Sequence, residues 1–327
     1  MTTQITIIGL GQIGTSIGLA LAKHTANIKR VGYDRIIDVQ NKAKELGALD
    51  TVKFNLFSAL EGADLVLLCI PLDQVEETLK LIAPDLRDQA VVMDFSAQKS
   101  TAHKWFQEHI PADRHYIGLV PSTNPQFLDQ NGGGIDTARA DLFEQATIGI
   151  AAPPGTPAEA LKLAEDLVNL IGGKPLFLDM LEADGMSMTT HLLPQALAAA
   201  LLNATIDQPG WSEARRFASR PFAQASAALG SDPLNALALG LLNNPAGALN
   251  ALDGVIAALT HIRAAVQKGD QADLEKRLGL AFEDREQWLN ERQRADWNRV
   301  EEKKDLPHPG EAFKRMFVGQ LFKNKKK

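Results

Sequence analysis

Three glycines near the start of the chain stand at a spacing that suits phosphate binding. Gly9, Gly11 and Gly14 form the pattern G-x-G-x-x-G between the apolar run 5–8 and the helical run 16–22. In such a turn the first glycine permits a tight bend, the second lets the backbone approach a pyrophosphate, and the third lets the helix pack on the strand. Free N–H groups at the helix start attract the phosphates. The pattern predicts a dinucleotide-binding site.

An acidic residue follows at the distance that this kind of site requires. Asp34 ends a second predicted strand, 29–34, about twenty residues after the glycines. Its carboxylate is placed to accept hydrogen bonds from the ribose hydroxyls of NAD, whereas Arg35 suits adenine or a 2′-phosphate. NAD is therefore the favoured cofactor, and NADP stays an alternative. The predicted cofactor-binding residues are Gly9, Gly11, Gln12, Ile13, Gly14, Asp34, Arg35 and Pro71.

The elements that must position these residues change in kind along the chain. Strands and helices alternate in the first half, which indicates a parallel sheet, and long helical patterns dominate beyond residue 183. We expect an α/β fold with an N-terminal Rossmann-like doubly wound parallel sheet, followed by an all-α helical dimerisation domain. Its predicted parts are a dinucleotide-binding domain at 1–179, a helical substrate and dimerisation domain at 180–305, and a basic, flexible tail at 306–327. Small apolar helices commonly pack against a partner chain, so we expect a homodimer.

Composition excludes several other classes of protein. The chain has 327 residues, 45% of them hydrophobic and 23% charged, and a formal net charge of −6. This charge argues against a general nucleic-acid binder. No apolar run reaches the length of a membrane span, and no secretory signal pattern opens the chain. The single cysteine, Cys69, excludes an internal disulfide and fits a reducing cytoplasm. We therefore expect a cytoplasmic protein with a small-molecule substrate, and neither nucleic acid nor membrane as a partner.

Several further motifs, in a shared order, resemble the prephenate/arogenate dehydrogenase family over residues 4 to about 295. Asp94 to Lys99 stands where the family has D-x-G-S-x-K, and His191 to Gln195 stands where it has S-H-L-P-H. The remaining markers are the glycine turn through Ser16, the strand end Gly32 to Arg35, the strand end Ile117 to Pro121, and the segment Ser231 to Pro233 with Leu241 to Asn244.

The resemblance implies a Rossmann domain, a helical dimerisation domain, and a reaction of tyrosine biosynthesis. That reaction is the oxidative decarboxylation of prephenate or arogenate with NAD(P). It needs a group that takes the hydroxyl proton, which the family supplies as histidine assisted by serine, and cationic groups for the substrate carboxylates. At the family's functional positions this chain has Val120, Ala97, Leu192, Gln195 and Ala227, and only Lys99 matches.

Four of these five replacements put an apolar side chain where the family has a polar or charged one. Val120 cannot take a proton, and a pocket without arginine binds a dicarboxylate poorly, because unpaired buried carboxylates are costly. We expect Val120, Ala97, Leu192 and Ala227 to form one apolar pocket that takes a different substrate. Two alternatives stay open: an ordinary prephenate or arogenate dehydrogenase, and a regulatory protein that binds the dinucleotide without turnover.

Few groups remain for a replacement chemistry. Lys99 and His191 are the predicted catalytic residues: Lys99 either orients a ligand or holds a loop, and His191 stands one residue before the family's histidine position. Ser122, Thr123 and Asn124 follow a strand end where cofactor and substrate usually meet, and turn formation explains them equally well. For two other groups the structural interpretation is favoured: Asp184 caps the start of its own helix, and Arg215, Arg216 and Arg220 form a surface cluster paired with Glu213 rather than an anion clamp. No metal site is expected, since His103, His109 and His115 share no face.

Overall fold

The computed structural model describes residues 2–130, 132–294 and 297. These residues divide into two compact units, Met1–Pro245 and Ala246–Lys327, and each unit is described by itself. The predicted tail, 306–327, lies outside the described residues. The predicted boundary at residue 179 falls between the last strand of the sheet and the next helix, but the helices up to Asn243 belong to the same compact unit as the sheet.

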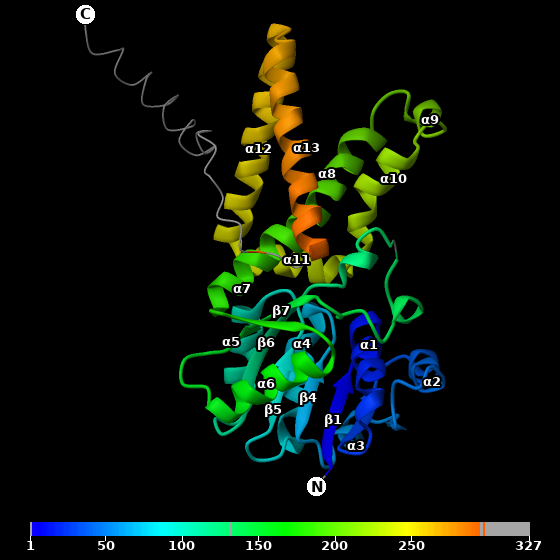
Figure 1. Cartoon of the computed structure of the whole chain (residues 1–327), viewed down its shortest axis with the longest axis vertical. Helices are drawn as coiled ribbons and strands as arrows, with labels where there is room; N and C mark the ends of the chain where they lie inside the picture. The colour runs from blue at the N-terminus through cyan, green and yellow to red at the C-terminus, as the bar shows by residue number, and fades with distance from the viewer. Residues whose placement is uncertain (1, 131, 295–296, 298–327) are drawn as a thin grey trace, which may run out of the picture. The chain divides into compact units, whose positions relative to one another are not determined.

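One sheet of eight strands organises the first unit, and Figure 1 labels five of its strands. The strand order is β3-β2-β1-β4-β5-β6-β7-β8. Neighbouring strands are parallel except β6 and β7, which are antiparallel. The strands are β1 (Thr3–Ile8), β2 (Ile28–Tyr33), β3 (Thr51–Val52), β4 (Leu65–Leu68), β5 (Val91–Asp94), β6 (His115–Pro121), β7 (Thr147–Ala151) and β8 (Lys174–Leu178). The predicted doubly wound sheet is confirmed. Its first switch point lies between β1 and β4, where such sheets open a ligand crevice.

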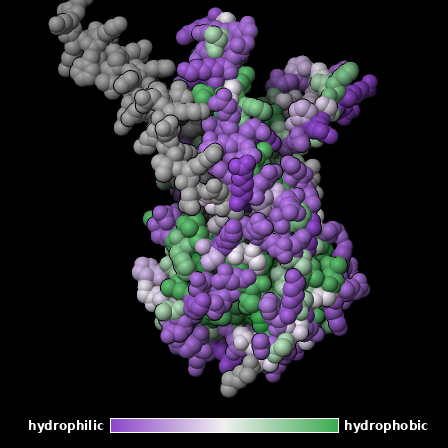
Figure 2. Space-filling model, in the orientation of Figure 1, coloured by the Kyte–Doolittle hydropathy of each residue, from purple (hydrophilic) through white to green (hydrophobic). Residues whose placement is uncertain are grey.

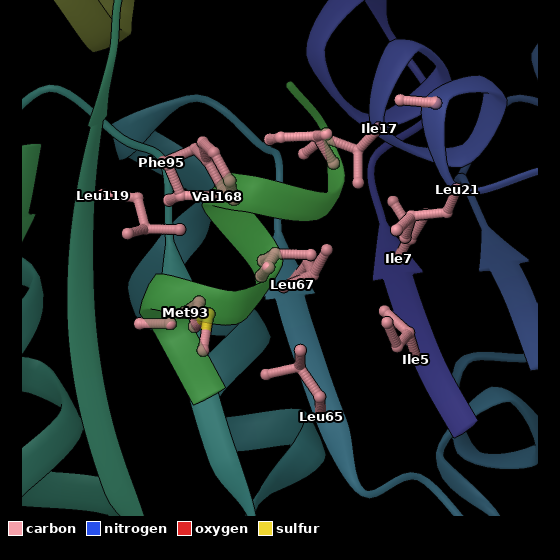
Figure 3. Packing of buried hydrophobic residues seen from close by; sticks show 14 of the residues in the cluster. Ile5, Ile7, Ile17, Leu21, Leu65, Leu67, Met93, Phe95, Leu119 and Val168 are labelled. Atoms are coloured by element: carbon pink, nitrogen blue, oxygen red, sulfur yellow. The ribbon is translucent and has the colours of Figure 1, made fainter. Parts of the chain in front are cut away.

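Helices cover both faces of this sheet. They are α1 (Gln12–Ala20), α2 (Ile37–Glu45), α3 (Leu56–Leu60), α4 (Leu72–Ile82), α5 (Lys99–His109) and α6 (Ala158–Leu170). Because both faces are buried, the central strands are apolar without alternation: all four residues of β4 are buried. Figure 3 shows one face, on which Ile5 and Ile7 of β1 lie beside Leu65 and Leu67 of β4. The opposite face packs Val66 and Leu68 against the helices on the other side.

A helical layer completes the first unit. It consists of α7 (Met180–Ser187), a π-helical turn (Met188–Leu192), α8 (Leu193–Ile206), α9 (Trp211–Ala214), α10 (Arg220–Ala227) and α11 (Leu234–Asn243). Helix α7 packs on α5, and α11 packs on α4. Since α4 and α5 begin at the carboxyl ends of β4 and β5, these contacts join the helical layer to the edge of the sheet where the crevice opens.

The described residues of the second unit form two long helices, α12 (Pro245–Lys268), whose first residue still belongs to the first unit, and α13 (Gln271–Arg294). Several of their large apolar side chains are exposed, among them Ile256 and Leu259 at 59% each. By length and composition α12 would also suffice to cross a membrane, a test that a core helix of a soluble protein passes as well. Over the surface drawn in Figure 2, hydrophilic side chains predominate and hydrophobic ones lie between them.

Candidate functional site

The glycine turn joins β1 to α1, and its three glycines are held there for different reasons. Gly9 has φ +91°, and a Cβ on it would lie 2.4 Å from the carbonyl oxygen of Cys69. A Cβ on Gly14 would lie 2.0 Å from the carbonyl oxygen of Gly9. A Cβ on Gly11 would meet nothing within 4 Å. The fold therefore requires Gly9 and Gly14, whereas Gly11 leaves open space in front of the backbone.

Helix α1 begins at this open space without a side-chain cap. Gly11 is its N-cap residue and offers no side chain to the N–H groups of the first turn, which includes Gln12 and Ile13. Uncapped N–H groups and the positive end of the helix dipole attract a pyrophosphate. The residues present thus fit a dinucleotide, because the Gly11 cradle is open and the helix start is free to donate.

Asp34 lies directly beside the glycine turn. Its carboxylate accepts a hydrogen bond from the Leu10 amide at 2.8 Å and another from the Ile36 amide at 2.9 Å. Two backbone donors therefore fix the direction of the carboxylate at the carboxyl end of β2. The Arg35 side chain is exposed next to it. On the other side of β1, Pro71 is the N-cap residue of α4, just beyond the carboxyl end of β4.

The structure encloses Lys99 entirely. Its ammonium group donates to the Asp94 carbonyl at 2.9 Å, to the Asp94 carboxylate at 3.3 Å and to the Ser96 carbonyl, and the side chain is 0% exposed. Gly118 gives it room, since a Cβ there would lie 2.6 Å from Lys99 Cδ. Burial lowers the pKa of Lys99, while the Asp94 carboxylate opposes that shift. All three N–H donors are used inside the protein, so Lys99 holds the loop after β5 in place.

Asp184 caps a helix, although not the one predicted. The side chain of Asp179 caps α7, the helix that contains Asp184. The buried carboxylate of Asp184 instead accepts from the backbone amides of Lys99 and Ser100, the first residues of α5. The prediction that Asp184 caps its own helix was therefore wrong, because it lies within α7 and faces the free amides of a helix from the sheet-bearing part of the chain.

His191 lies in the π-helical turn and contacts an acid that sequence reasoning did not single out. Its Nε2 lies 2.6 Å from an Asp232 carboxylate oxygen, which also accepts from Gln195 Nε2 at 2.8 Å. Burial by itself raises the pKa of Asp232, but hydrogen bonds from His191 and Gln195 outweigh it and leave that pKa lowered. The only sequence signal for Asp232 was the Ser-Asp-Pro start of α11. The His191 side chain is 45% exposed.

The five positions that we expect to differ from the family lie on several elements. Ala97 and Val120 are half-buried at the ends of the neighbouring strands β5 and β6. Leu192 is 0% exposed and packs against Gly240 of α11, and Ala227 is exposed on α10. The apolar pocket of Val120, Ala97, Leu192 and Ala227 stays a prediction: Ala97 and Val120 lie at the ends of neighbouring strands, whereas Leu192 is fully enclosed. Gln195 is buried on Asp232.

The other polar side chains considered as site residues are either hydrogen-bonded to the backbone or exposed at the surface. Ser122 Oγ donates to the Thr147 carbonyl at 2.6 Å, and the Asn124 side chain donates to the Asp141 carbonyl. Arg215, Arg216 and Arg220 are exposed, but among the described residues Glu213 pairs with the Ser212 hydroxyl rather than with them, so the predicted pairing was wrong.

One grouping of metal-ligating side chains was not foreseen. Glu76, Glu108 and His109 have ligand atoms within 4.8 Å of one another. The Glu76 carboxylate is already compensated by Lys80 at 2.6 Å, and the group lies at the surface. A cation there would compete with the lysine, and the grouping supports no metal site.

Comparison with known proteins gives two family matches that cover most of the chain. Residues 17–176 match the nucleotide-binding domain of prephenate dehydrogenase, and residues 182–280 match its dimerization domain. A cyclohexadienyl dehydrogenase of Zymomonas mobilis is 29% identical over 269 residues, which is 82% of this chain and 89% of that protein. A prephenate dehydrogenase of Bacillus subtilis is 25% identical over 84% of this chain and 73% of its own length.

Solved structures share the fold at lower identity. The prephenate dehydrogenase of Aquifex aeolicus in complex with hydroxyphenyl propionate and NAD+ superposes with a TM-score of 0.76 at 20% identity, covering 88% of this chain and 98% of that one. An arogenate dehydrogenase of Synechocystis gives 0.67 at 22% identity, covering 88% and 100%.

Proposed function

The chain belongs to the prephenate dehydrogenase family, and from that premise we propose that it is an NAD-dependent oxidoreductase whose substrate differs from free prephenate. The family membership supports the nicotinamide cofactor. The change of substrate is supported by the carboxyl ends of β5 and β6, where Ala97 and Val120 supply neither a proton acceptor nor a cation. This single observation carries the proposal.

The cofactor is assigned to the glycine turn. The N–H groups of Gln12 and Ile13 bind the pyrophosphate, the open backbone at Gly11 lets it approach, and Asp34 accepts from the adenosine ribose. Pro71 borders the cofactor across the crevice, and Arg35 lies beside the adenosine. Bound NAD supplies the acceptor for a hydride. Since Asp34 is a fixed carboxylate, it repels a 2′-phosphate and favours NAD over NADP.

The acid–base role is assigned to His191. Alcohol oxidation releases the hydroxyl proton, so a proton acceptor must reach that oxygen. Asp232 and Gln195 orient the His191 ring, and the ring nitrogen that faces away from Asp232 takes the proton. Lys99 does not touch the reacting atoms in this assignment. It positions the loop that carries Ala97.

A turnover assay tests this proposal. The reduction of NAD+ is followed by the absorbance of NADH, with prephenate and with arogenate as substrates. We expect neither to support turnover, while calorimetry detects NAD+ binding to the same preparation. Ordinary turnover of either compound would show that the substitutions do not matter and would favour the alternative of a conventional enzyme.

A panel of hydroxy acids and cyclic alcohols distinguishes an enzyme from a regulator. Once a compound supports NAD+ reduction, His191→Gln should lower kcat by about 100-fold or more, because general acid–base catalysis contributes about that much, while the Kd for NAD+ stays unchanged. Thr190→Ala, at the neighbouring exposed position, serves as the control. Tight NAD+ binding with no turnover of any compound would favour the regulatory alternative.

Assembly and location follow from the same family. We propose a homodimer formed through the helical part of the chain, because residues 182–280 match a dimerization domain and apolar side chains of α12 and α13 are exposed. We propose a cytoplasmic location and a small-molecule substrate, since a single cysteine and a net charge of −6 suit a reducing compartment without nucleic-acid binding.

A further inference from the structure

Residues 122–146 join β6 to β7 by a long connection whose described residues, 122–130 and 132–146, form two short 3-10 helices, Pro125–Phe127 and Ile135–Thr137. Connections longer than about 12–15 residues without regular structure are uncommon in compact domains, and they commonly serve as binding loops or lids. This connection packs beside α1 and α2, the two helices that flank the adenosine half of the dinucleotide site.

The base of the connection is fixed. The Asn124 amide donates to the Leu142 carbonyl at 2.7 Å, and the Asn124 side chain donates to the Asp141 carbonyl at 3.1 Å. Leu142 and Phe143 are buried in the core beneath. The Arg139 guanidinium lies 3.4 Å from the centre of the Phe127 ring and pairs with Asp141. These contacts tie the two ends of the connection together.

The outer part, residues 134–139, reaches the helix that starts at the glycine turn. Thr137 accepts from Gln12 Nε2 at 3.5 Å, and the Arg139 amide donates to Ser16 Oγ at 3.0 Å. Asp136 forms an ion pair with Lys42 of α2. Because Gln12 is the first residue of α1, the segment lies along the edge of the cradle in which the pyrophosphate is bound.

The ion pair that holds residues 134–139 to α2 is exposed to solvent. The Lys42 and Asp136 side chains are 44% and 76% exposed, so solvent and salt screen their attraction. Glycines precede the segment, and Gly134 adopts φ +74°, a conformation that a residue with a side chain rarely takes. To lift, the segment must release this ion pair and the hydrogen bonds to Gln12 and Ser16 and withdraw Ile135 from the edge of the core, while the base stays in place.

We propose that residues 134–139 form a strap that retains the bound dinucleotide and lifts when the cofactor exchanges, with Lys42 and Asp136 as its latch. The proposal rests on the proposed NAD function. It predicts that opening the latch speeds cofactor release, because release requires the strap to leave the edge of the Gly11 cradle.

Stopped-flow fluorescence of NADH release tests the strap on the full chain. Lys42→Ala and Asp136→Ala should each release NADH about two to five times faster than the wild type, the range expected for a screened ion pair. The double variant should be no faster than either single one, and Lys44→Ala, an exposed lysine of the same helix, should not differ from the wild type. Added salt should speed release from the wild type and not from the latch variants.

Two glycine variants give a second, independent readout. Gly134→Ala strains the start of the strap and should speed NADH release, whereas Gly133→Ala meets nothing within 4 Å and has no positive φ, so it should behave as the wild type. Wild-type release rates in both latch variants and in Gly134→Ala would overturn the strap while leaving NAD binding intact. If the wild type binds no NADH in an equilibrium titration, the proposed function fails, and the strap fails with it.

Discussion

Of the three glycines after β1, two are required by the packing of the fold and the third leaves room for a ligand. Gly9 and Gly14 are packed against backbone, so a side chain at either position must push strands or helix apart. Gly11 faces open space at the start of α1, and nothing in the described protein demands a glycine there. The local pattern predicted the turn correctly because strand, turn and helix are adjacent in sequence.

Gly11→Ala should therefore affect binding and spare folding. We expect the free energy of unfolding to change by less than about 0.5 kcal/mol, as at an unencumbered site, and the affinity for NAD+ to fall at least about tenfold, since a methyl group occupies the space of the pyrophosphate. Chemical denaturation and calorimetry measure the two quantities. Gly14→Ala is the contrasting variant, and it should unfold more easily. An unchanged affinity in Gly11→Ala would place the cofactor elsewhere.

The residue types of Lys99 and His191 alone do not determine their roles. A lysine near a strand end predicts ligand contact and loop support equally well, and only the three acceptors around its ammonium group favour the second role. His191 drew attention as a titratable group, but its partner Asp232 lies 41 residues further along the chain. Contacts at that separation depend on how helices pack, which the sequence pattern does not specify.

At the scale of elements, the start of α5 depends on a residue from another helix. Its own N-cap residue, Gln98, makes no side-chain cap, and Asp184 of α7 accepts from the first two amides instead. Asp184→Ala should lower the free energy of unfolding by about 1.5–3 kcal/mol, the range for hydrogen bonds to a charged group. Asp179→Ala, which removes the cap of α7 at an exposed position, should cost about 1 kcal/mol. Equal effects of the two variants would contradict the assignment of the α5 cap to Asp184.

The strand that carries the ribose-binding acid is held by a buried arginine. Arg30 of β2 is 4% exposed, donates to the carbonyls of Gly18 and Gly47, and pairs with Asp50 at 2.6 Å. The hydrogen bond from Arg30 lowers the pKa of Asp50 below its ordinary value of 3.8. Arg30 therefore links α1, α2 and β2, the elements around Asp34.

The ion pair of Arg30 and Asp50 predicts how the free energy of unfolding changes with pH. Because the folded-state pKa of Asp50 is lowered, its contribution is complete above pH 3.8 and is lost as the pH falls through the lower, folded-state pKa. Asp50→Asn should cost about 1.5–3 kcal/mol at neutral pH and should flatten the fall in stability toward acid. Asp113→Asn, which removes a carboxylate that is 41% exposed beside Arg114, is the control and should cost less than Asp50→Asn. The measurement is the denaturant midpoint of each variant across the acid pH range. If the midpoints of wild type and Asp50→Asn fall in parallel as the pH is lowered, Asp50 does not contribute to the acid sensitivity.

For the whole molecule, the alternation of strands and helices and the amino-acid composition predicted the fold class. They did not predict how the residues of the functional site are arranged. The parallel sheet and the later helices were predictable because their patterns are local. The antiparallel pairing of β6 with β7, the position of Leu192 against Gly240 and the strap beside α1 depend on contacts between distant segments. Whether Ala97, Val120, Leu192 and Ala227 face one substrate likewise depends on the packing of distant segments, which a local pattern does not specify.

The exposed apolar side chains of α12 predict assembly. We expect two copies of the 35.5 kDa chain to sediment together at micromolar concentration. Ile256→Glu should shift the population toward the monomer, because it would bury a charge in an apolar contact. Gln267→Glu adds the same charge at an exposed polar position of the helix and should leave the dimer intact. A monomer at all concentrations would show that another surface or no surface is used.

A crystal structure of the protein with NAD+ bound tests the proposed cofactor site and the position of His191 most directly. We predict the pyrophosphate on the N–H groups at the start of α1, the adenosine ribose on Asp34, and the His191 ring facing the nicotinamide across the substrate space, with Ala97 and Val120 as its wall. A nicotinamide that lies against a different titratable side chain, or a pyrophosphate away from Gly11, would contradict the proposal that this chain keeps its family's cofactor site and has changed its substrate.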